Sequence, residues 1–392
     1  MAKKKIIIIG GGAAGMMAAE RFCNDFEIAI YEKGKTIGRK FLVAGNGGFN
    51  LTNKVEKEDL TQYYRSHNFL KKAILDNDSS KMRIWLSNLG IPTFIGTSGR
   101  IFPEKGIKPV QVLKSIRDRL IEKGVIIFTH HKFIGFDEKC NCIVEHNNSE
   151  ITLSADYFIF SLGGASWSKT GSDGTWTTTF EKIGVKTIPF QASNCGLNIE
   201  WSDHFKIHHA GKHLKNIKIS IDRFEIKGEA TITDYGLEGN AIYPLIWKVR
   251  ESFSKGDTPK ISIDFKPLNP REQLLDKIKN KAQRTKTFAL SLNLNSTQIA
   301  LIKSFSDKKY FLEPSVFITN VKQLQIPIHS LRPMEEAIST VGGIDINEVN
   351  ANFSLKKNSS IFVIGEMLDW DAPTGGFLLQ GCFSMAHAIE IK

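Results

Sequence analysis

Residues 5–15 read KIIIIGGGAAG, and this stretch decides the fold. Lys5–Ile9 is a short β-branched run that ends at glycine, which is typical of a buried parallel strand. Ala13–Cys23 contains helix-forming residues without proline, and Glu27–Tyr31 is a second apolar run. A strand, a glycine turn, a helix and another strand in this order predict a βαβ unit with a right-handed crossover.

Three glycines in this turn, Gly10, Gly12 and Gly15, match the dinucleotide-binding pattern G-x-G-x-x-G. In that pattern the first glycine permits the tight turn, the second lets a pyrophosphate approach the backbone, and the third lets the helix pack against the strand. The pyrophosphate would lie near the N–H groups of Ala13 and Ala14, where the helix dipole favours an anion. An ordinary glycine turn would explain the glycines alone, but the strand before them and the helix after them favour a nucleotide site.

An acidic residue follows where such a motif requires one. Glu32 ends the second strand, about 20 residues beyond the turn, where a carboxylate holds ribose hydroxyls. Lys33 comes directly after it. A carboxylate at this place would repel a 2′-phosphate, so the motif indicates FAD or NAD rather than NADP. The alternative is a surface glutamate beside a structural turn.

The end of the chain discriminates between these two dinucleotides. Ser360–Gly365 indicates a late strand, followed by Glu366 and then by Thr374–Phe377 at the start of an apolar helix. A carboxylate after such a strand can hold a polyol chain, and a Gly-Gly turn can place N–H groups at the pyrimidine edge of a flavin. That edge gains negative charge on reduction, which a helix N-terminus stabilises. These features favour FAD, although a purely structural strand-turn-helix also satisfies the pattern.

A third segment, Tyr157–Gly164, is a buried strand that ends in Gly163 and Gly164. It could bring its backbone close to the same cofactor, and a tight turn at a strand end explains the pattern equally well.

The motifs extend along nearly the whole chain, at Gly10–Gly15, Gly38–Lys40, Ala44–Asn53, Gly99–Pro103, Leu162–Gly164, Val341–Ile344, Gly365–Glu366, Asp369 and Thr374–Phe377. In content and order they resemble the BaiN and aminoacetone-oxidase-like (YhiN-type) family of flavoproteins. The resemblance implies FAD, a glutathione-reductase-type FAD-binding domain, and a domain inserted between the halves of its sheet.

The resemblance also implies specific contacts with the cofactor. Glu32 would hold the adenosine ribose, Gly45–Gly48 and Asn53 would lie along the cofactor, and Glu366 with Gly375–Leu378 would lie near the ribityl chain and the flavin. The predicted cofactor-binding residues are Gly10, Gly12, Ala13, Ala14, Gly15, Glu32, Lys33, Arg39, Lys40, Gly45, Asn46, Gly47, Asn53, Gly163, Gly164, Gly365, Glu366, Gly375, Gly376, Phe377 and Leu378.

The chain departs from the family pattern at Gly48 and Phe49. Many members carry Gly-Gly-Arg-Cys-Asn where this chain has Asn46-Gly47-Gly48-Phe49-Asn50. A role that requires that arginine or that thiol therefore has no counterpart here. The variant resembles a less characterised branch, as do Gly236–Gly239 and His329–Pro333.

The pattern of the chain changes after Pro189. Residues 190–265 alternate apolar and polar positions, which indicates an antiparallel sheet, and residues 270–325 have helical periodicity. We predict an α/β fold with a glutathione-reductase-type FAD-binding Rossmann domain of residues 1–189 and 336–392. An inserted β-plus-helical domain of residues 190–335 interrupts it.

The 392 residues carry a formal net charge of +11, with a pI near 9.2. The lysines are spread along the chain, and the denser clusters Lys3–Lys5 and Lys277–Lys286 resemble solvated faces. This distribution favours general surface charge over a nucleic-acid groove. Five cysteines without zinc-type spacing predict no metal site and a reducing, cytoplasmic location. No apolar run is long enough to span a membrane.

Few other side chains suggest chemistry. His209 and His213 are four residues apart, but no carboxylate joins them, so no metal site is predicted. Arg100 and Arg332 could each clamp an anionic substrate or form surface salt bridges. No catalytic base stands out in the sequence.

The sequence predicts an FAD-dependent oxidoreductase that moves a hydride between flavin N5 and a small organic substrate in a cleft between the FAD domain and the insert. Without a second G-x-G-x-x-G unit, NAD(P)H would bind only as a transient donor. Reduction of an enone-like substrate by NAD(P)H and oxidation of an amine by O₂ both remain open. The net charge motivates a rival, an FAD-containing RNA-modifying or RNA-binding protein, and a flavin-binding module without turnover is a third hypothesis. The substrate and the oligomeric state are not predicted.

Overall fold

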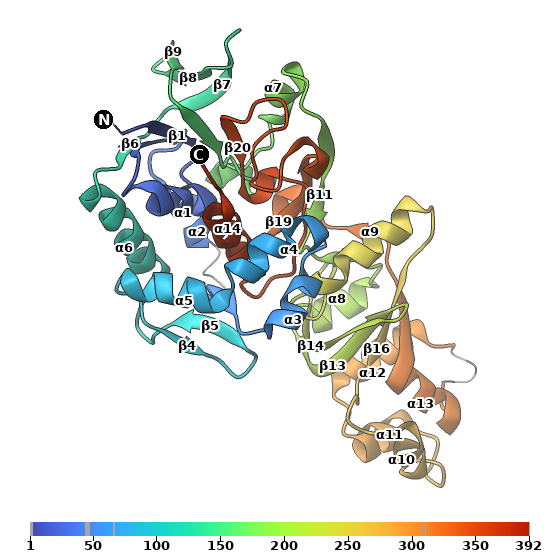
Figure 1. Cartoon of the computed structure of the whole chain (residues 1–392). Helices are drawn as coiled ribbons and strands as arrows, with labels where there is room; N and C mark the ends of the chain where they lie inside the picture. The colour runs from blue at the N-terminus through green and yellow to red at the C-terminus, as the bar shows by residue number, and fades with distance from the viewer. Residues whose placement is uncertain (1–2, 44–47, 66, 308, 310, 392) are drawn as a thin grey trace. The chain divides into compact units, whose positions relative to one another are not determined.

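The computed structural model describes residues 3–43, 48–65, 67–307, 309 and 311–391, without the side chains of residues 57, 58 and 67. It divides into two compact units (Figure 1). The first unit combines Met1–Ala192 with Met334–Lys392, and the second is Ser193–Pro333. The predicted domain division at residues 189 and 335 stays a prediction, whereas the boundaries of the compact units lie at residues 192 and 333.

A five-stranded sheet forms the centre of the first unit. All its neighbouring strands are parallel, in the order β20-β10-β1-β2-β6. Ile6–Ile9 are at most 1% exposed, as expected for a parallel sheet that is covered on both faces. The strands are β1 (Lys5–Ile9), β2 (Glu27–Tyr31), β6 (Ile126–Phe128), β10 (Tyr157–Phe160) and β20 (Ile361–Val363).

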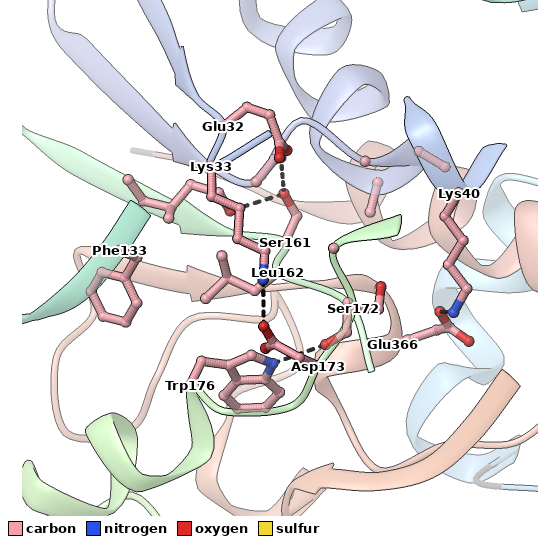
Figure 2. A pocket seen from close by; sticks show the side chains of 18 of the residues that line it. Glu32, Lys33, Lys40, Phe133, Ser161, Leu162, Ser172, Asp173, Trp176 and Glu366 are labelled. Carbon is pink, nitrogen blue, oxygen red and sulfur yellow. Dashed lines mark hydrogen bonds and ion pairs between the residues drawn. The ribbon is translucent and has the colours of Figure 1, made fainter. Parts of the chain in front are cut away.

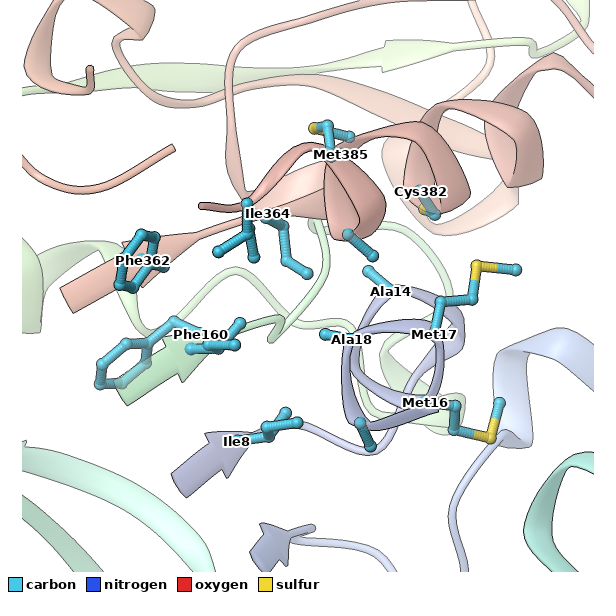
Figure 3. Packing of buried hydrophobic residues seen from close by; sticks show 14 of the residues in the cluster. Ile8, Ala14, Met16, Met17, Ala18, Phe160, Phe362, Ile364, Cys382 and Met385 are labelled. Atoms are coloured by element: carbon cyan, nitrogen blue, oxygen red, sulfur yellow. The ribbon is translucent and has the colours of Figure 1, made fainter. Parts of the chain in front are cut away.

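Two helices from opposite ends of the chain pack against each other, and the first of them also contacts β1, β2 and β10 of this sheet (Figure 3). They are α1 (Ala13–Phe22) and α14 (Phe377–Ala388). Their close approach depends on small side chains, since Ala14 of α1 lies near Cys382 of α14 in the buried cluster. The predicted βαβ unit near the start of the chain and the predicted strand-turn-helix near its end therefore meet at one helix pair.

A second sheet, β7-β8-β9, supplies aromatic side chains that pack against the central one. Phe160 of β10 has its ring centroid 5.0 Å from that of Phe133 of β7 and 5.1 Å from that of Phe180 of α7. The strands are β7 (Lys132–Phe136), β8 (Cys142–His146) and β9 (Ser149–Leu153), and the helix is α7 (Thr177–Lys182).

Further elements complete the first unit. A small antiparallel sheet has the order β3-β5-β4, and β11 pairs with β19. Their bounds are β3 (Thr52–Asn53), β4 (Thr93–Ile95), β5 (Arg100–Pro103), β11 (Thr187–Ser193) and β19 (Ser339–Ile344), with helices α2 (Arg39–Val43), α3 (Lys57–Leu60), α4 (His67–Asp76), α5 (Ser79–Asn88) and α6 (Pro109–Glu122), and 3-10 turns η1 (Thr61–Tyr63), η2 (Ser168–Thr170), η4 (Met334–Glu336), η5 (Ile346–Glu348) and η6 (Gly365–Met367).

The second unit is a seven-stranded sheet with helices, in the order β17-β16-β13-β14-β15-β12-β18. Its neighbouring strands pair antiparallel, which agrees with the alternating pattern of the sequence. The elements are β12 (Leu197–Asn198), β13 (His213–Ile221), β14 (Phe224–Ile232), β15 (Gly236–Glu238), β16 (Lys260–Asp264), β17 (Leu324–Pro327), β18 (Ser330–Leu331), α8 (Asp203–His209), α9 (Ile246–Ser254), α10 (Arg271–Asp276), α11 (Thr285–Leu292), α12 (Ser296–Phe305), α13 (Pro314–Gln323) and η3 (Tyr243–Leu245).

The predicted fold class is confirmed: a parallel α/β unit of Rossmann type accompanies an antiparallel sheet with helices. Within the part of the chain that the structure describes, no helix combines the length and the apolar character needed to cross a membrane.

Candidate cofactor site

A cavity of about 390 Å³ lies in the first unit, where the parallel strands end. That volume is in the range of sites for drug-sized ligands and cofactors. In open parallel sheets, ligands bind outside the carboxyl ends of the strands. Residues at or just beyond the ends of all five strands line this cavity, namely Ile9 and Gly10 after β1, Tyr31–Lys33 after β2, His131 after β6, Ser161–Gly163 after β10 and Ile364–Glu366 after β20.

The glycine turn after β1 fits a pyrophosphate. Gly10 has φ +102°, and a β carbon on it would lie 2.5 Å from the carbonyl oxygen of Ser161. A β carbon on Gly15 would lie 2.1 Å from the carbonyl oxygen of Gly10. Gly12 differs, because it lines the cavity and the nearest atom to its β carbon would be 3.9 Å away. It is also the N-cap of α1 and provides no side-chain acceptor, so the first turn of the helix can accept an anion.

Glu32 lies at one end of the cavity (Figure 2). Its two carboxylate oxygens accept hydrogen bonds from the backbone N–H groups of Gly11, at 2.8 Å, and Gly34, at 2.7 Å. These bonds fix the carboxylate, and each oxygen keeps a lone pair for a further donor. A fixed acceptor beside the glycine turn is the chemistry that ribose hydroxyls require.

Lys33, which follows Glu32, forms an ion pair at the cavity wall. Nζ of Lys33 lies 2.7 Å from Oδ2 of Asp173, and both residues line the cavity (Figure 2). Burial acts to raise the pKa of Asp173, but hydrogen bonds from Lys33 and Thr175 outweigh it and lower the pKa. Asp173 therefore stays ionised at neutral pH.

A second polar cluster lies at the other end. Nζ of Lys40 donates to Oγ of Ser166 and to Oε2 of Glu366, both at 2.9 Å. Three segments meet here: α2, the loop after β10 and the turn after β20. Beneath them Cys382 is buried, and burial raises the pKa of its thiol to about 12, so it stays protonated at neutral pH.

The start of α14 is held by neighbouring side chains. Gly375 and Gly376 have φ of +107° and +98°, and a β carbon on Gly376 would lie 2.5 Å from the backbone of Thr52. Nδ2 of Asn53 donates to the carbonyl oxygen of Gly375 at 3.1 Å, and the hydroxyl of Tyr64 donates to that of Phe377 at 2.9 Å. The glycine pair thus lets α14 begin against β3.

The predicted residues fall into three groups. Those at the cavity wall are Gly10, Gly12, Ala13, Ala14, Glu32, Lys33, Lys40, Gly163, Gly365, Glu366 and Leu378. Those that the described structure places outside the wall are Gly15, Arg39, Asn53, Gly164, Gly375, Gly376 and Phe377. Gly45, Asn46 and Gly47 lie outside the described residues.

Two of the residues outside the wall have clear structural contacts. A β carbon on Gly164 would lie 2.1 Å from Oγ1 of Thr340, so this glycine allows a close approach of chain segments. The guanidinium of Arg39 donates to the carbonyl oxygen of Lys169 at 2.7 Å.

The sequence interpretation missed part of the wall. Asp173 pairs with Lys33, and Nε1 of Trp176 donates to the carbonyl oxygen of Gly163 at 3.0 Å. Asp173 lies within the polar stretch Thr170–Gly174 and Trp176 follows that stretch, which comes soon after a predicted strand. A polar, glycine-containing loop beyond a parallel strand is a signal that could have identified them.

No metal site accompanies the cavity among the described residues, since no three His, Cys, Asp or Glu side chains gather to hold an ion. His209 ends α8 and lies 3.1 Å from Oγ1 of Thr297, whereas His213 begins β13. The two histidines therefore share no helix face.

The sequence profile described as HI0933-like protein Rossmann domain matches residues 4–390. The chain belongs to this family. The resemblance inferred from the motifs is confirmed, because the HI0933-like family includes the BaiN and YhiN-type flavoproteins.

Two curated relatives of this HI0933-like chain match along most of their length. A ribosomal RNA dihydrouridine synthase of Haemophilus influenzae is 25% identical over 383 residues, which cover 93% of this chain and 92% of the relative. A 3-dehydro-bile acid delta(4,6)-reductase of Clostridium scindens is 24% identical over 390 residues, with 95% and 93% covered.

Solved structures share the fold. A 3-ketosteroid delta1-dehydrogenase from Sterolibacterium denitrificans has a TM-score of 0.52 at 13% identity, with 99% of each chain covered. A 3-ketosteroid-delta4-(5alpha)-dehydrogenase from Rhodococcus jostii has a TM-score of 0.52 at 12% identity, with 99% of this chain and 97% of that chain covered.

Family membership and the geometry of the cavity lead to the same cofactor. FAD is the cofactor of this HI0933-like protein, and the chain is an FAD-dependent oxidoreductase.

Proposed function

We propose that this chain reduces a carbon–carbon double bond conjugated to a carbonyl group, with NAD(P)H as a transient electron donor. When bound, the flavin supplies hydride exchange at N5, and the protein supplies binding, orientation and electrostatics. The single observation that carries the proposal is the reaction shared by two relatives that cover the whole fold.

The names of those relatives describe the same chemistry on different molecules. A delta(4,6)-reductase of a 3-dehydro-bile acid saturates bonds conjugated with a ring ketone. A dihydrouridine synthase saturates the ring bond that is conjugated with a pyrimidine carbonyl. The functional group common to both is an activated double bond, and this favours reduction over oxidation of an amine by O₂.

The residues of the cavity divide the binding of FAD among them. Glu32 would accept the adenosine ribose hydroxyls, the glycine turn with Ala13 and Ala14 would bind the pyrophosphate, and Glu366 would accept ribityl hydroxyls. Lys40 holds Glu366 in place through its 2.9 Å ion pair. The remaining predicted cofactor residues, including Gly375–Phe377 at the start of α14, stay part of the proposal.

The proposed reaction uses neither the thiol of Cys382 nor a thiol at the family cysteine position. Cys382 stays protonated, because burial raises the pKa of its thiol to about 12. The family cysteine position is Phe49 in this chain, and Phe49 is buried against Phe41. The reaction therefore proceeds without a protein thiolate at either place.

Anaerobic photometry tests the proposal. NADH or NADPH should bleach the bound flavin, and a conjugated ketone should restore its colour with a product that has gained two hydrogen atoms by mass spectrometry. Bleaching by amines but by neither nicotinamide would establish amine oxidation instead. Absence of bleaching by every reductant would leave a flavin-binding module and would overturn the proposal.

A second candidate places the same double bond in a uracil ring of RNA. The specific observation in its favour is the distribution of charge, because most of the net positive charge lies in residues 193–333. Incubation of the reduced protein with RNA, followed by nucleoside mass spectrometry, should then reveal dihydrouridine. Reduction of ketones alone would eliminate this candidate.

The cytoplasmic location of the protein stays a prediction.

A further inference from the structure

The second unit carries most of the positive charge of the chain. Residues 193–333 contain 22 lysines and arginines and 14 acidic residues, a net charge of +8 out of +11. The larger first unit therefore carries only +3. The lysines are spread along both units, and the difference in net charge between the units stands beside that spread.

Four exposed cations without an ion pair among the described residues follow one another closely in the sequence of this unit, and they are here called the α10–α11 basic surface. It consists of Lys277, Lys281, Arg284 and Lys286, in the connection from α10 and the first turn of α11. All four are exposed. Among the described residues none of them forms an ion pair, whereas their neighbour Lys279 pairs with Asp276 at 2.6 Å.

The surface extends to β16. Lys266 follows that strand, and its pKa is lowered, first by burial and second by the positive charge of Lys277. Like charges held close together disfavour each other unless an anion lies between them. The described structure holds no acidic side chain paired with either lysine, so an anion from outside the chain would stabilise this surface.

Among its described residues, the second unit has no strongly exposed aromatic side chain on which unpaired bases could stack. Proteins that bind single strands stack the bases on aromatic side chains. The strongly exposed large hydrophobic residues described in the second unit are Ile207, Leu268 and Leu290, and none is aromatic. The available contacts are therefore charge contacts, which suit the phosphates of a base-paired backbone.

A membrane is less suited to the same surface. Helices that lie on membranes present a continuous apolar face to the lipid. The apolar residues Phe288 and Leu292 of α11 are at most 3% exposed, because they pack into the core of their own unit. Among the described residues of α11, Leu290 is the strongly exposed large hydrophobic side chain.

We propose that the α10–α11 basic surface docks the phosphate backbone of a base-paired RNA. The identity of the reacting group in that RNA rests on the proposed function, whereas the docking itself can be measured without turnover. Each phosphate contact adds about 0.9 to the slope of log affinity against log salt concentration. Loss of four contacts should therefore lower the slope by about 3–4 and weaken binding at least about tenfold at low salt.

The test uses the full-length FAD-loaded protein and a fluorescent RNA hairpin of about 20 base pairs, which exceeds the span of a compact duplex-binding domain. Anisotropy is measured from roughly 50 to 200 mM salt. One variant carries Lys277→Gln, Lys281→Gln, Arg284→Gln and Lys286→Gln. The matched control removes four exposed lysines of the first unit by Lys71→Gln, Lys105→Gln, Lys139→Gln and Lys182→Gln.

The proposal expects the first variant to lose affinity and slope while the control binds as the wild-type protein does. Equal losses in both variants would mean a diffuse charge effect and would overturn it, as would an unchanged first variant. Binding to phosphatidylserine vesicles with the same four-residue dependence, but not to the hairpin, would assign the surface to a membrane instead.

Two readouts separate folding and catalysis from docking. Far-ultraviolet circular dichroism and flavin content check that each variant is folded. A double variant, Lys281→Gln with Lys286→Gln, should show about half the change in the salt slope of RNA binding. Hairpin binding with the expected slope but no flavin reduction by any donor would sink the proposed function and leave the docking surface standing.

Discussion

Replacement of Gly12 by alanine should separate FAD binding from folding. Gly12 has φ −76° and ψ −172°, an extended conformation that alanine adopts readily. A β carbon there would have no atom of the protein closer than 3.9 Å, and the residue lines the cavity. The added methyl group would therefore occupy space that the pyrophosphate needs, without a clash with other atoms of the protein.

The size of the effect follows from the bonds at the helix N-terminus. Displacement of the phosphate from one backbone N–H group would lose a charge-assisted hydrogen bond of about 1.5–3 kcal/mol. That loss corresponds to roughly 10- to 100-fold weaker FAD binding. Alanine at an N-cap in place of glycine should destabilise the FAD-free protein by only about 0.5–1 kcal/mol.

Gly15→Ala is the matched control. Its β carbon would lie 2.1 Å from the carbonyl oxygen of Gly10, so it should destabilise the FAD-free protein by about 1–3 kcal/mol or more. FAD titration by flavin fluorescence and urea unfolding of FAD-free protein measure the two effects. The reasoning fails if Gly12→Ala binds FAD as tightly as the wild-type protein, or if it unfolds as easily as Gly15→Ala.

Three further predictions concern single residues. Glu366→Gln should weaken FAD binding about tenfold, through loss of one charged acceptor, in the same fluorescence titration; unchanged affinity would exclude a cofactor role. Gly376→Ala should lower the free energy of unfolding by about 2–3 kcal/mol, because its φ is +98° and its β carbon would meet the backbone of Thr52; a neutral effect in urea unfolding would contradict this strain. Burial lowers the pKa of His387 to about 4 from an ordinary 6.5. Between these two pH values the imidazole is protonated in the unfolded chain but neutral in the folded protein. The free energy of unfolding should therefore fall by up to about 3 kcal/mol as the pH drops from 6.5 to 4. Urea unfolding of wild-type protein and His387→Gln at pH 7 and 4.5 should show a smaller loss in the variant, and parallel losses would refute the assignment.

The nucleotide end of the site was predictable because its signals are local. The turn at Gly10–Gly15 and the acid at Glu32 lie within one βαβ unit, where spacing alone determines which strand ends they follow. The cavity wall includes most of that turn and the acid. The replacement of the family cysteine by Phe49 was also predictable, because it depends only on the order of residues.

Other parts of the site depend on contacts between distant segments. The ion pairs Lys33–Asp173 and Lys40–Glu366 join residues that are 140 and 326 positions apart. No periodicity or motif encodes such partners, because pairing depends on how the strand ends and loops meet in space. The positive residues of the α10–α11 basic surface can be counted in the sequence. The net charge of the second unit, however, could be calculated only once its boundaries were known.

The amino-acid order by itself determined the class of fold, the family and the dinucleotide motif, since these depend on short-range patterns of glycine, β-branched and charged residues. Only the tertiary structure decided that the ends of all five parallel strands surround one cavity, and that α14 lies against α1. It also decided that Gly376 allows a backbone approach to Thr52. The physical reason is that burial and contact are properties of the packed chain, whereas propensity and spacing are properties of the order of residues.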